Sequence, residues 1–154
     1  MRIKFSDGLG TETKIEVLNC ELNDNFRDSW IEFIPNSVAS FKKVFFRYQL
    51  PNSDYIYVII ENAFFSYKNN TVSIKHSGQL LNFYKQQTYD NEFLKLKENE
   101  YKDLMKEITY LKLMDSLDVD ITKKAKIKGL ENDLFELKAI TLFSLMPSTF
   151  NGEE

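Results

Sequence analysis

The sequence predicts an α+β fold in which an antiparallel β-sheet from the N-terminal half is covered by helices from the C-terminal half. Up to His76, short alternations of apolar and polar residues are separated by turn residues, which predicts strands. The stretch 99–117 instead places apolar residues at three- and four-residue spacings, which predicts a helix. A length of 154 residues favours one domain, expected over 1–146, with a polar tail at 147–154.

The first predicted elements are a hairpin and a third strand. Segments 2–6 and 14–19 alternate in polarity, and Asp7-Gly8-Leu9-Gly10 between them is typical of a turn. A strand is then expected from Trp30 to Ile34. Trp30, the single tryptophan, either packs in the core or contacts a partner.

A longer hairpin is predicted around a four-residue turn at 51–54. This turn places Tyr48 opposite Tyr57 on one side of the ribbon. The other side would pair Phe45 with Ile60, Arg47 with Val58, and Gln49 with Ile56. Since both sides carry apolar residues, the mixed side is either covered by the fold or available to a partner. The predicted partner-contact residues are Phe45, Arg47, Gln49, Ile56 and Val58.

The next hairpin turns at Asn69-Asn70, because asparagine tolerates the positive φ that a two-residue turn requires. This turn predicts that Tyr67 faces Val72 and Phe65 faces Ile74. After it, the apolar residues between 80 and 84 predict a short helix.

The central helix is expected to be an inner helix of the core. Asn99 can cap its start, although the helix could also continue from the segment 91–96. Its apolar stripe consists of Tyr101, Leu104, Met105, Ile108, Leu111 and Met114. The last element, 130–146, fits either a buried helix ended by Pro147 or a strand, and its length favours the helix.

Composition narrows the function classes. The net charge of −3, with acids and bases interspersed, argues against a general nucleic-acid binder. Cys20 is the only cysteine, so it is expected to be a buried thiol in a reducing compartment. No apolar run reaches the ~20 residues of a membrane span and no signal-peptide segment follows Met1, so a cytoplasmic location without membrane contact is expected. The abundance of Lys, Asn, Ile, Phe and Tyr resembles coding by an AT-rich bacterial or phage genome.

No catalytic constellation can be selected from the sequence. The lone histidine, His76, has no serine–acid or cysteine partner nearby and is expected to be a surface or capping residue. Asp115, Asp118 and Asp120 supply oxygen ligands but lack the glycine and distal glutamate of an EF-hand loop. Phosphate-cradling loops, HExxH and paired CxxC motifs are absent. We therefore expect no catalytic residues, no metal and no cofactor.

One local charge anomaly precedes Gly129. Lys123, Lys124, Lys126 and Lys128 form a basic group that is expected to be a loop. One interpretation assigns it no function and reads it as a solvated loop whose positive charge is partly neutralised by nearby acidic residues. Its functional interpretation is a contact for an RNA phosphate or an acidic partner.

The same region resembles a known family. Glu92-Phe93-Leu94-Lys95-Leu96, Ile108-Thr109-Tyr110-Leu111 and the segment 126–138 resemble the first half of RelE/HigB-type toxins, most specifically at Leu134-Phe135-Glu136-Leu137. The resemblance implies a helical pair, a basic loop and a strand, with ribosome-dependent mRNA cleavage. It would make Lys126, Lys128 and Lys138 the residues that face RNA. Together with Lys124, they are the predicted contacts for RNA or an acidic partner. Lys138 stands where that family has arginine, and only sixteen residues follow.

The favoured expectation is a small intracellular, non-catalytic protein-binding module, such as an inhibitor, immunity or antidefence factor of a bacterium or phage. Its partner would be another protein, and nucleic acid would be bound only if the RelE-like alternative holds. A phage structural or assembly protein is a third possibility. The sequence gives no oligomeric state.

Overall fold

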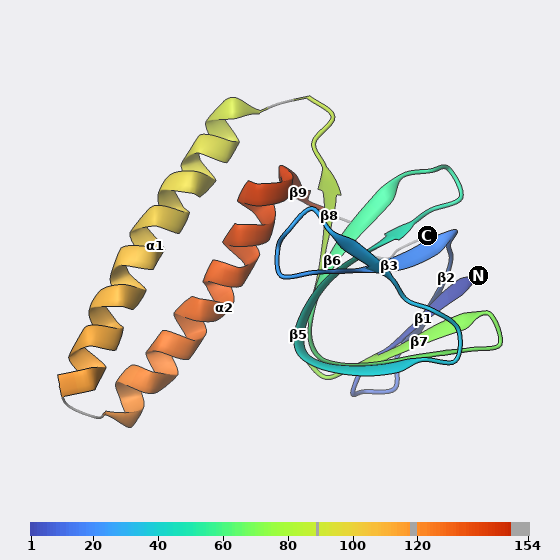
Figure 1. Cartoon of the computed structure of the whole chain (residues 1–154), viewed down its shortest axis with the longest axis horizontal. Coiled ribbons are helices and arrows are strands. Elements are labelled where there is room, and N and C mark those ends of the chain that lie inside the picture. The colour runs from blue at the N-terminus through green and yellow to red at the C-terminus, as the bar shows by residue number, and fades with distance from the viewer. Residues whose placement is uncertain (89, 118–119, 149–154) are drawn as a thin grey trace. The chain divides into compact units, whose positions relative to one another are not determined.

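The computed structural model describes residues 1–88, 90–117 and 120–148. These residues form nine strands and two helices (Figure 1). The α+β class is thereby confirmed, with a large, mostly antiparallel sheet in the N-terminal part and both helices after it. The elements are β1 (Arg2–Ser6), β2 (Glu12–Glu16), β3 (Asn19–Asn23), β4 (Trp30–Glu32), β5 (Val38–Gln49), β6 (Tyr55–Lys68), β7 (Thr71–His76), β8 (Leu80–Lys85), α1 (Asn91–Leu117), α2 (Ile121–Phe143) and β9 (Leu145–Pro147).

The chain divides into two compact units. Among the described residues, the first contains Met1–Lys85 and 146–148, and the second lies within Gln86–Leu145. Whether they act as the single domain expected over 1–146 stays a prediction, as does helical cover of the sheet. Of the polar tail expected at 147–154, residues 149–154 lie outside the described residues.

The sheet of the first unit has the strand order β2-β1-β7-β6-β5-β3-β4, and β8 pairs with β6 and with β9. The expected opening hairpin is confirmed, since β1 pairs antiparallel with β2. Asp7 shapes its turn by accepting hydrogen bonds from the amides of Leu9 and Thr11 at 2.9 and 2.8 Å. The β1–β7 pair is parallel, so the mostly antiparallel sheet contains one parallel contact.

The hairpin at Asn69-Asn70 is also confirmed. Both asparagines have positive φ, 52° and 58°, and Phe65 pairs with Ile74 as expected. Adjacent residues with positive φ match the right-handed twist of the two strands, which is why this short turn fixes the register.

The register expected for the β5–β6 hairpin is wrong by one residue. The observed partners are Arg47–Tyr57 and Phe46–Val58 instead of Arg47–Val58. The difference arises in the turn, where Leu50 accepts a hydrogen bond from the amide of Ser53 and donates one to the carbonyl of Asp54. Leu50 thus belongs to the loop, and shifting a strand by one residue exchanges its two faces.

The alternation of side chains along the β5–β6 ribbon is interrupted once. Val58 and Ile60 face the buried cluster, but beyond Asn62 the residues facing it are Ala63 and Phe65. Two consecutive core positions are therefore three residues apart instead of two. Asn62 has φ of 48°, a left-handed conformation that breaks the pleat of a strand. Before this break β6 pairs with β8, and after it β6 pairs with β7.

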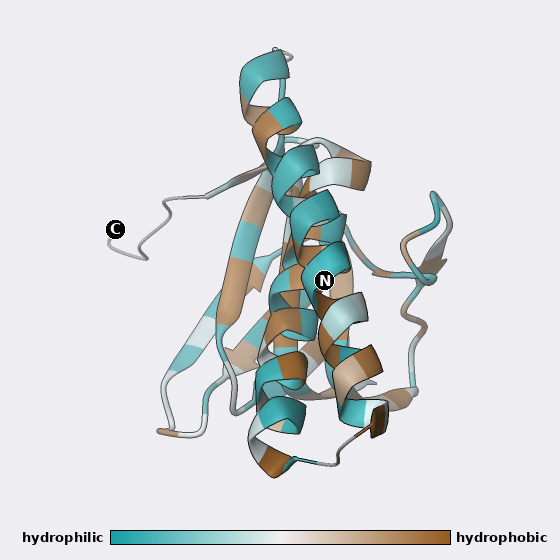
Figure 2. Ribbon diagram, turned by 90° about the vertical axis from the view of Figure 1, so that its left-hand side faces the viewer, coloured by the Kyte–Doolittle hydropathy of each residue, from teal (hydrophilic) through white to brown (hydrophobic). Residues whose placement is uncertain are grey.

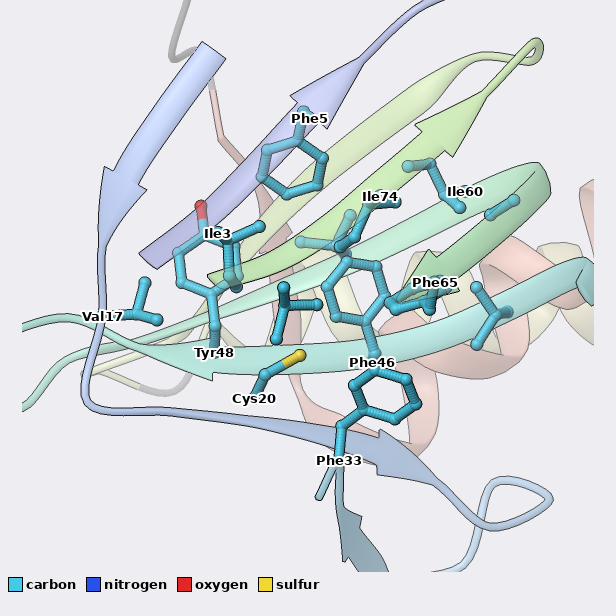
Figure 3. Close-up of a cluster of buried hydrophobic side chains, with 14 residues drawn as sticks. Ile3, Phe5, Val17, Cys20, Phe33, Phe46, Tyr48, Ile60, Phe65 and Ile74 are labelled. Atoms are coloured by element: carbon cyan, nitrogen blue, oxygen red, sulfur yellow. The ribbon is translucent and has the colours of Figure 1, made fainter. Parts of the chain in front are cut away.

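The buried cluster lies on one face of this bent sheet (Figure 3). At its centre Phe65 makes edge-to-face contacts with Phe46, Phe41 and Phe33, with ring centroids 5.2, 5.5 and 5.7 Å apart. Cys20 is fully buried among these residues, as expected from the sequence.

The segment expected to be a short helix, 80–84, is instead strand β8. Val58 and Ile60 of β6 pair with Asn82 and Leu80. The apolar run was too short to distinguish a helix from a strand by its period, and pairing with β6 decided the outcome. The turn before β8 passes so close to Glu61 that a Cβ added to Gly78 would lie 2.6 Å from the Cβ of Glu61.

The second unit is a pair of helices that pack on each other. α1 begins at Asn91 and not at Asn99, because Asp90 caps it by accepting a hydrogen bond from the amide of Phe93 at 3.0 Å. The helical alternative for the last element is confirmed over 130–143, although the helix ends before Pro147 at the left-handed Ser144. That the stripe of α1 faces the sheet stays a prediction.

The expected basic loop at 123–128 is wrong, because these residues form the first turns of α2. Asp120 caps α2 by accepting a hydrogen bond from the amide of Thr122 at 2.9 Å. The lysines follow directly and favour helix over loop by their own propensity. None of the helices in the described part of the chain combines the length and the apolar character needed to cross a membrane.

We predict that stability depends on how easily residue 62 adopts a left-handed backbone conformation. Asn62→Gly should leave the free energy of unfolding within about 0.5 kcal/mol, whereas Asn62→Val should lower it by about 1–2 kcal/mol. Ser40→Val is the control. Ser40 is an exposed strand residue whose φ is not positive, so it should tolerate valine. Urea unfolding measures all three, and equal stability of Asn62→Val and Asn62→Gly would contradict the assignment.

We predict that the free energy of unfolding falls as the pH rises from about 9 to about 12. Burial raises the pKa of the Cys20 thiol from 9.0 to about 12, and burial together with Cys20 raises the pKa of the Tyr48 hydroxyl from 10.0 to about 12. The unfolded chain ionises these groups first. The stabilisation is therefore complete below pH 9 and falls between pH 9 and 12, by about 4 kcal/mol for Cys20 and about 3 kcal/mol for Tyr48.

A Cys20→Ala, Tyr48→Phe variant tests this directly. Its free energy of unfolding should show a shallower fall between pH 9 and 12 than that of the parent protein, while the two curves run parallel below pH 8. Denaturant titrations at a series of pH values measure both slopes. An unchanged alkaline slope in the variant would refute the prediction.

Candidate partner-binding surface

The corrected register divides the predicted partner-contact residues between the two faces of the sheet. Phe45, Arg47 and Gln49 lie on the face opposite the Phe65 cluster. Ile56 and Val58 lie on the cluster face, and Val58 is fully buried there. The expected common face with Phe45, Arg47 and Gln49 is therefore wrong for Ile56 and Val58, because the one-residue shift moved both side chains to the other face.

Arg47 is the centre of the outer face. Its guanidinium carbon lies 4.1 Å from the ring centroid of Trp30 and 4.3 Å from that of Tyr55. A planar cation between two aromatic faces is stabilised by their π-electron density. Glu21 completes the arrangement with an ion pair of 2.6 Å from its Oε2 to Nε of Arg47, and each side chain is only 19% exposed.

The charge of Arg47 is held in place by hydrogen bonds. Burial acts to lower the pKa of Arg47, but hydrogen bonds to Glu21 and Tyr57 and the charge interactions with both groups together outweigh it, so the pKa rises above its ordinary value. The guanidinium therefore stays positively charged while its planar faces are occupied by aromatic rings. The orientation of the Arg47 side chain is therefore fixed within the chain itself.

A tight turn between β3 and β4 brings a further ring to this surface. The amide of Arg27 donates a hydrogen bond to the carbonyl of Asp24 at 3.0 Å, which closes the turn around Asn25 and Phe26. Both central residues have positive φ, 52° and 59°, which is unfavourable for a phenylalanine. The turn places the Phe26 ring in a stacked contact with Phe45, with centroids 5.7 Å apart.

Beneath these residues lies a closed aromatic layer. Phe45 and Tyr57 are only 3% and 4% exposed, and their rings stack with centroids 6.1 Å apart. Trp30 contacts both of them edge to face, at 5.5 and 5.8 Å. Phe45 is thus a supporting residue of the surface. The half-exposed side chains that face outward are Phe26, Trp30, Arg47, Gln49 and Tyr55, which we call the Arg47 surface.

Gln49 lies at the rim of the Arg47 surface. Its side chain accepts a hydrogen bond from Asn19 at 3.2 Å and donates one to the carbonyl of Ser53 at 3.3 Å. Sequence reasoning missed Glu21, Phe26 and Tyr55, whose proximity depends on the register and on an unusual turn. The two-residue spacing of Phe45, Arg47 and Gln49 was the signal in the sequence that places them on one face of the strand. The correct turn would also have placed Tyr55 on that face.

The lysines proposed as RNA or acidic-partner contacts lie along α2 and do not share one face. Lys124 and Lys128 are exposed one turn apart, while Lys126 projects roughly 160° away and pairs with Glu107 at 3.5 Å. Lys138 is half-buried and lies roughly 20 Å along the helix from Lys124. The loop and strand implied by the RelE/HigB resemblance are also wrong, since 126–138 is helical throughout.

The remaining candidates in the described chain lie at the ends of β7, α1 and α2. The Nδ1 of His76 lies 3.0 Å from the carbonyl oxygen of Gly78, so the side chain closes the turn after β7. Asp120 is the cap of α2, Asp115 is half-buried, and Asp118 lies outside the described residues. Among described residues, no group of three histidine, cysteine, aspartate or glutamate side chains could hold a metal ion.

We predict strong coupling between Arg47 and Glu21. Arg47→Met should lower the free energy of unfolding by about 2 kcal/mol, because it removes the guanidinium and leaves the half-buried carboxylate without its partner. The double variant Arg47→Met, Glu21→Gln should lose less free energy of unfolding than the sum of the losses of the two single variants. The exposed pair Arg2–Glu16 is the matched control and should show much weaker coupling. Thermal and urea unfolding of the double-mutant cycles measure both, and equal coupling in the two pairs would contradict the prediction.

Comparison with known proteins places the sheet in a family. A family model described as the UU051 N-terminal domain matches residues 2–81, just over half of the chain. The match runs from β1 to the start of β8, so it contains every residue of the Arg47 surface and ends before α1. No curated protein matches the chain. The extent of the family match shows that this chain belongs to the UU051 N-terminal domain family.

Proposed function

We propose that this chain is a small, non-catalytic protein-binding module that contacts its partner through the Arg47 surface. The observation that carries the proposal is the Trp30–Arg47–Tyr55 sandwich, in which a partly buried guanidinium is held between two partly exposed aromatic rings. Tryptophan, tyrosine and arginine are the residues that most often dominate binding energy at protein interfaces.

The way in which this surface is built supports the proposal. Phe26 adopts an unfavourable left-handed backbone to stack on Phe45, and Arg47 and Glu21 are largely withdrawn from water as a pair. Each arrangement reduces stability relative to simple apolar packing. Such costs are typical of sites where the surface itself is selected, because a pre-ordered surface loses less entropy when it binds.

An apolar margin adjoins the surface along the chain. β4 ends the strand order of the sheet, and its Ile31 is 58% exposed. Ile34, just beyond β4, is 61% exposed. A partner on the Arg47 surface that reached past Trp30 along the chain would bury Ile34 and gain a further apolar contribution.

The proposal extends to a cytoplasmic inhibitor, immunity or antidefence factor of a bacterium or phage. A single cysteine, fully buried, supports a reducing compartment. The abundance of lysine, asparagine and aromatic residues supports an AT-rich bacterial or phage source.

We predict that truncating the two outer rings removes partner binding. The full-length chain is used to capture proteins from an extract of its native host, and the captured partner is purified and titrated by calorimetry. Trp30→Ala with Tyr55→Ala should raise the Kd by about 30-fold or more, because two central aromatic contacts are lost. Phe64→Ala is the matched control, since Phe64 is 44% exposed but lies outside the Arg47 surface, and its Kd should stay within about threefold.

A second variant separates binding from folding. Arg47→Lys keeps the positive charge but removes the planar group that stacks between the rings, so it should weaken binding with a small change in melting temperature. Circular dichroism and thermal unfolding check both variants. Unchanged affinity of the folded variants for the purified partner would contradict the proposal, as would chemical conversion of that partner by the parent protein.

A further inference from the structure

α1 carries a stripe of exposed residues in addition to the stripe that contains its buried residues. Seven exposed positions alternate at spacings of three and four residues, which is the a/d pattern of a coiled coil sustained over three heptads. These positions are Leu96, Asn99, Asp103, Lys106, Tyr110, Leu113 and Leu117, and we call them the α1 seam.

The α1 seam is separate from the side of α1 that is least exposed. Leu94 and Ile108 are the buried residues of α1, and Leu104 and Leu111 are half-buried between and beyond them. At 100° per residue these positions lie roughly 150° around the helix from the seam. By contrast, Leu96, Tyr110, Leu113 and Leu117 of the seam are between 55% and 76% exposed.

The polarity of the seam changes along the helix. Polar residues occupy the middle of α1, and hydrophobic residues gather towards the end that leads to α2 (Figure 2). The centre of the seam is the oppositely charged pair Asp103 and Lys106. Neither side chain has an ion-pair partner in the part of the chain that the structure describes.

We propose that the α1 seam binds the α1 seam of a second copy of this chain, with the two helices antiparallel about a twofold axis. A reversal centred between Asp103 and Lys106 places each aspartate opposite the lysine of the other copy. The same register places Leu96 opposite Leu113 and Asn99 opposite Tyr110, each twice by symmetry. A twofold interface must be self-complementary in this way, and this seam satisfies the condition in charge and in apolar contacts.

Charge also selects the orientation. Parallel helices in register would place Asp103 against Asp103 and Lys106 against Lys106, which is unfavourable at a close contact. Glu100 and Glu107 flank the seam in either orientation, but each is paired within its own chain, with Lys97 at 2.9 Å and with Lys126 at 3.5 Å. The acids beside the seam are therefore partly neutralised before association.

A charge-reversal series on the full-length chain tests the interface. Sedimentation equilibrium from about 1 to about 500 µM should show a mass that rises from one chain to two. Asp103→Lys should raise the dimer Kd by about tenfold or more, since two lysines then oppose each other at both ends of the central layer. Adding Lys106→Asp restores opposite charges and should return the Kd to within about threefold of the parent value.

Glu98→Lys is the matched control. It makes the same charge change on an exposed residue of α1 that lies outside the seam, and it should leave the Kd nearly unchanged. Circular dichroism confirms that α1 is retained in every variant. A parent protein that is monomeric at about 500 µM would overturn the proposal. A double variant that stays as weak as Asp103→Lys would overturn it too.

Disulfide trapping tests the orientation independently. A mixture of Asn99→Cys and Tyr110→Cys chains should form mixed disulfides, whereas each variant alone places its thiols roughly 16 Å apart along the helix axis and should not. The native Cys20 is fully buried and supplies no background. Efficient trapping of Asn99→Cys with itself would indicate parallel helices and overturn the proposal. Seam substitutions that weaken only the binding of a different protein would also overturn it.

Discussion

The fold depends on one interruption of strand alternation, at Asn62 of β6. A regular strand would turn either Ile60 or Ala63 away from the buried cluster, yet both face it because Asn62 adopts a left-handed backbone. The same break lets two successive strands use one edge of β6, with β8 before it and β7 after it. The turn joining β7 to β8 must then pass Glu61 closely, and Gly78 provides the space. Core, edge and connection thus meet at this one break in the β5–β6 ribbon.

Local signals predicted the parts of this fold that local chemistry controls. Asn69-Asn70 fixed the second hairpin and its register, because two asparagines with positive φ leave one favourable turn. The predicted register of the β5–β6 hairpin was wrong because the backbone of Leu50 makes its hydrogen bonds within the loop, which the sequence of the turn does not reveal. The helix predicted at 80–84 was wrong for another reason. Six residues are too few to show a period, and the strand that pairs with β8 is distant in sequence.

The Arg47 surface shows the same division. Phe45, Arg47 and Gln49 were predicted on one face because strand alternation is local, but their neighbours come from three other segments. Trp30 and Phe26 reach the surface through the β3–β4 turn, whose left-handed phenylalanine contradicts the usual preference for glycine or asparagine there. Sites built by unusual backbone are those that residue propensities cannot anticipate.

The placement of the helical unit between two paired strands has a consequence for the order of folding. β9 pairs with β8 although roughly sixty residues separate them, and closing a flexible loop of that length would cost about 3.6 kcal/mol in chain entropy. The ends of that segment are already joined, since the amide of Gln86 donates a hydrogen bond to the carbonyl of Ser144 at 3.0 Å. A helical hairpin made of contacts local in sequence can form early and deliver Leu145 beside β8 with little further entropy to lose. The last strand of the sheet therefore depends kinetically on the helices that precede it.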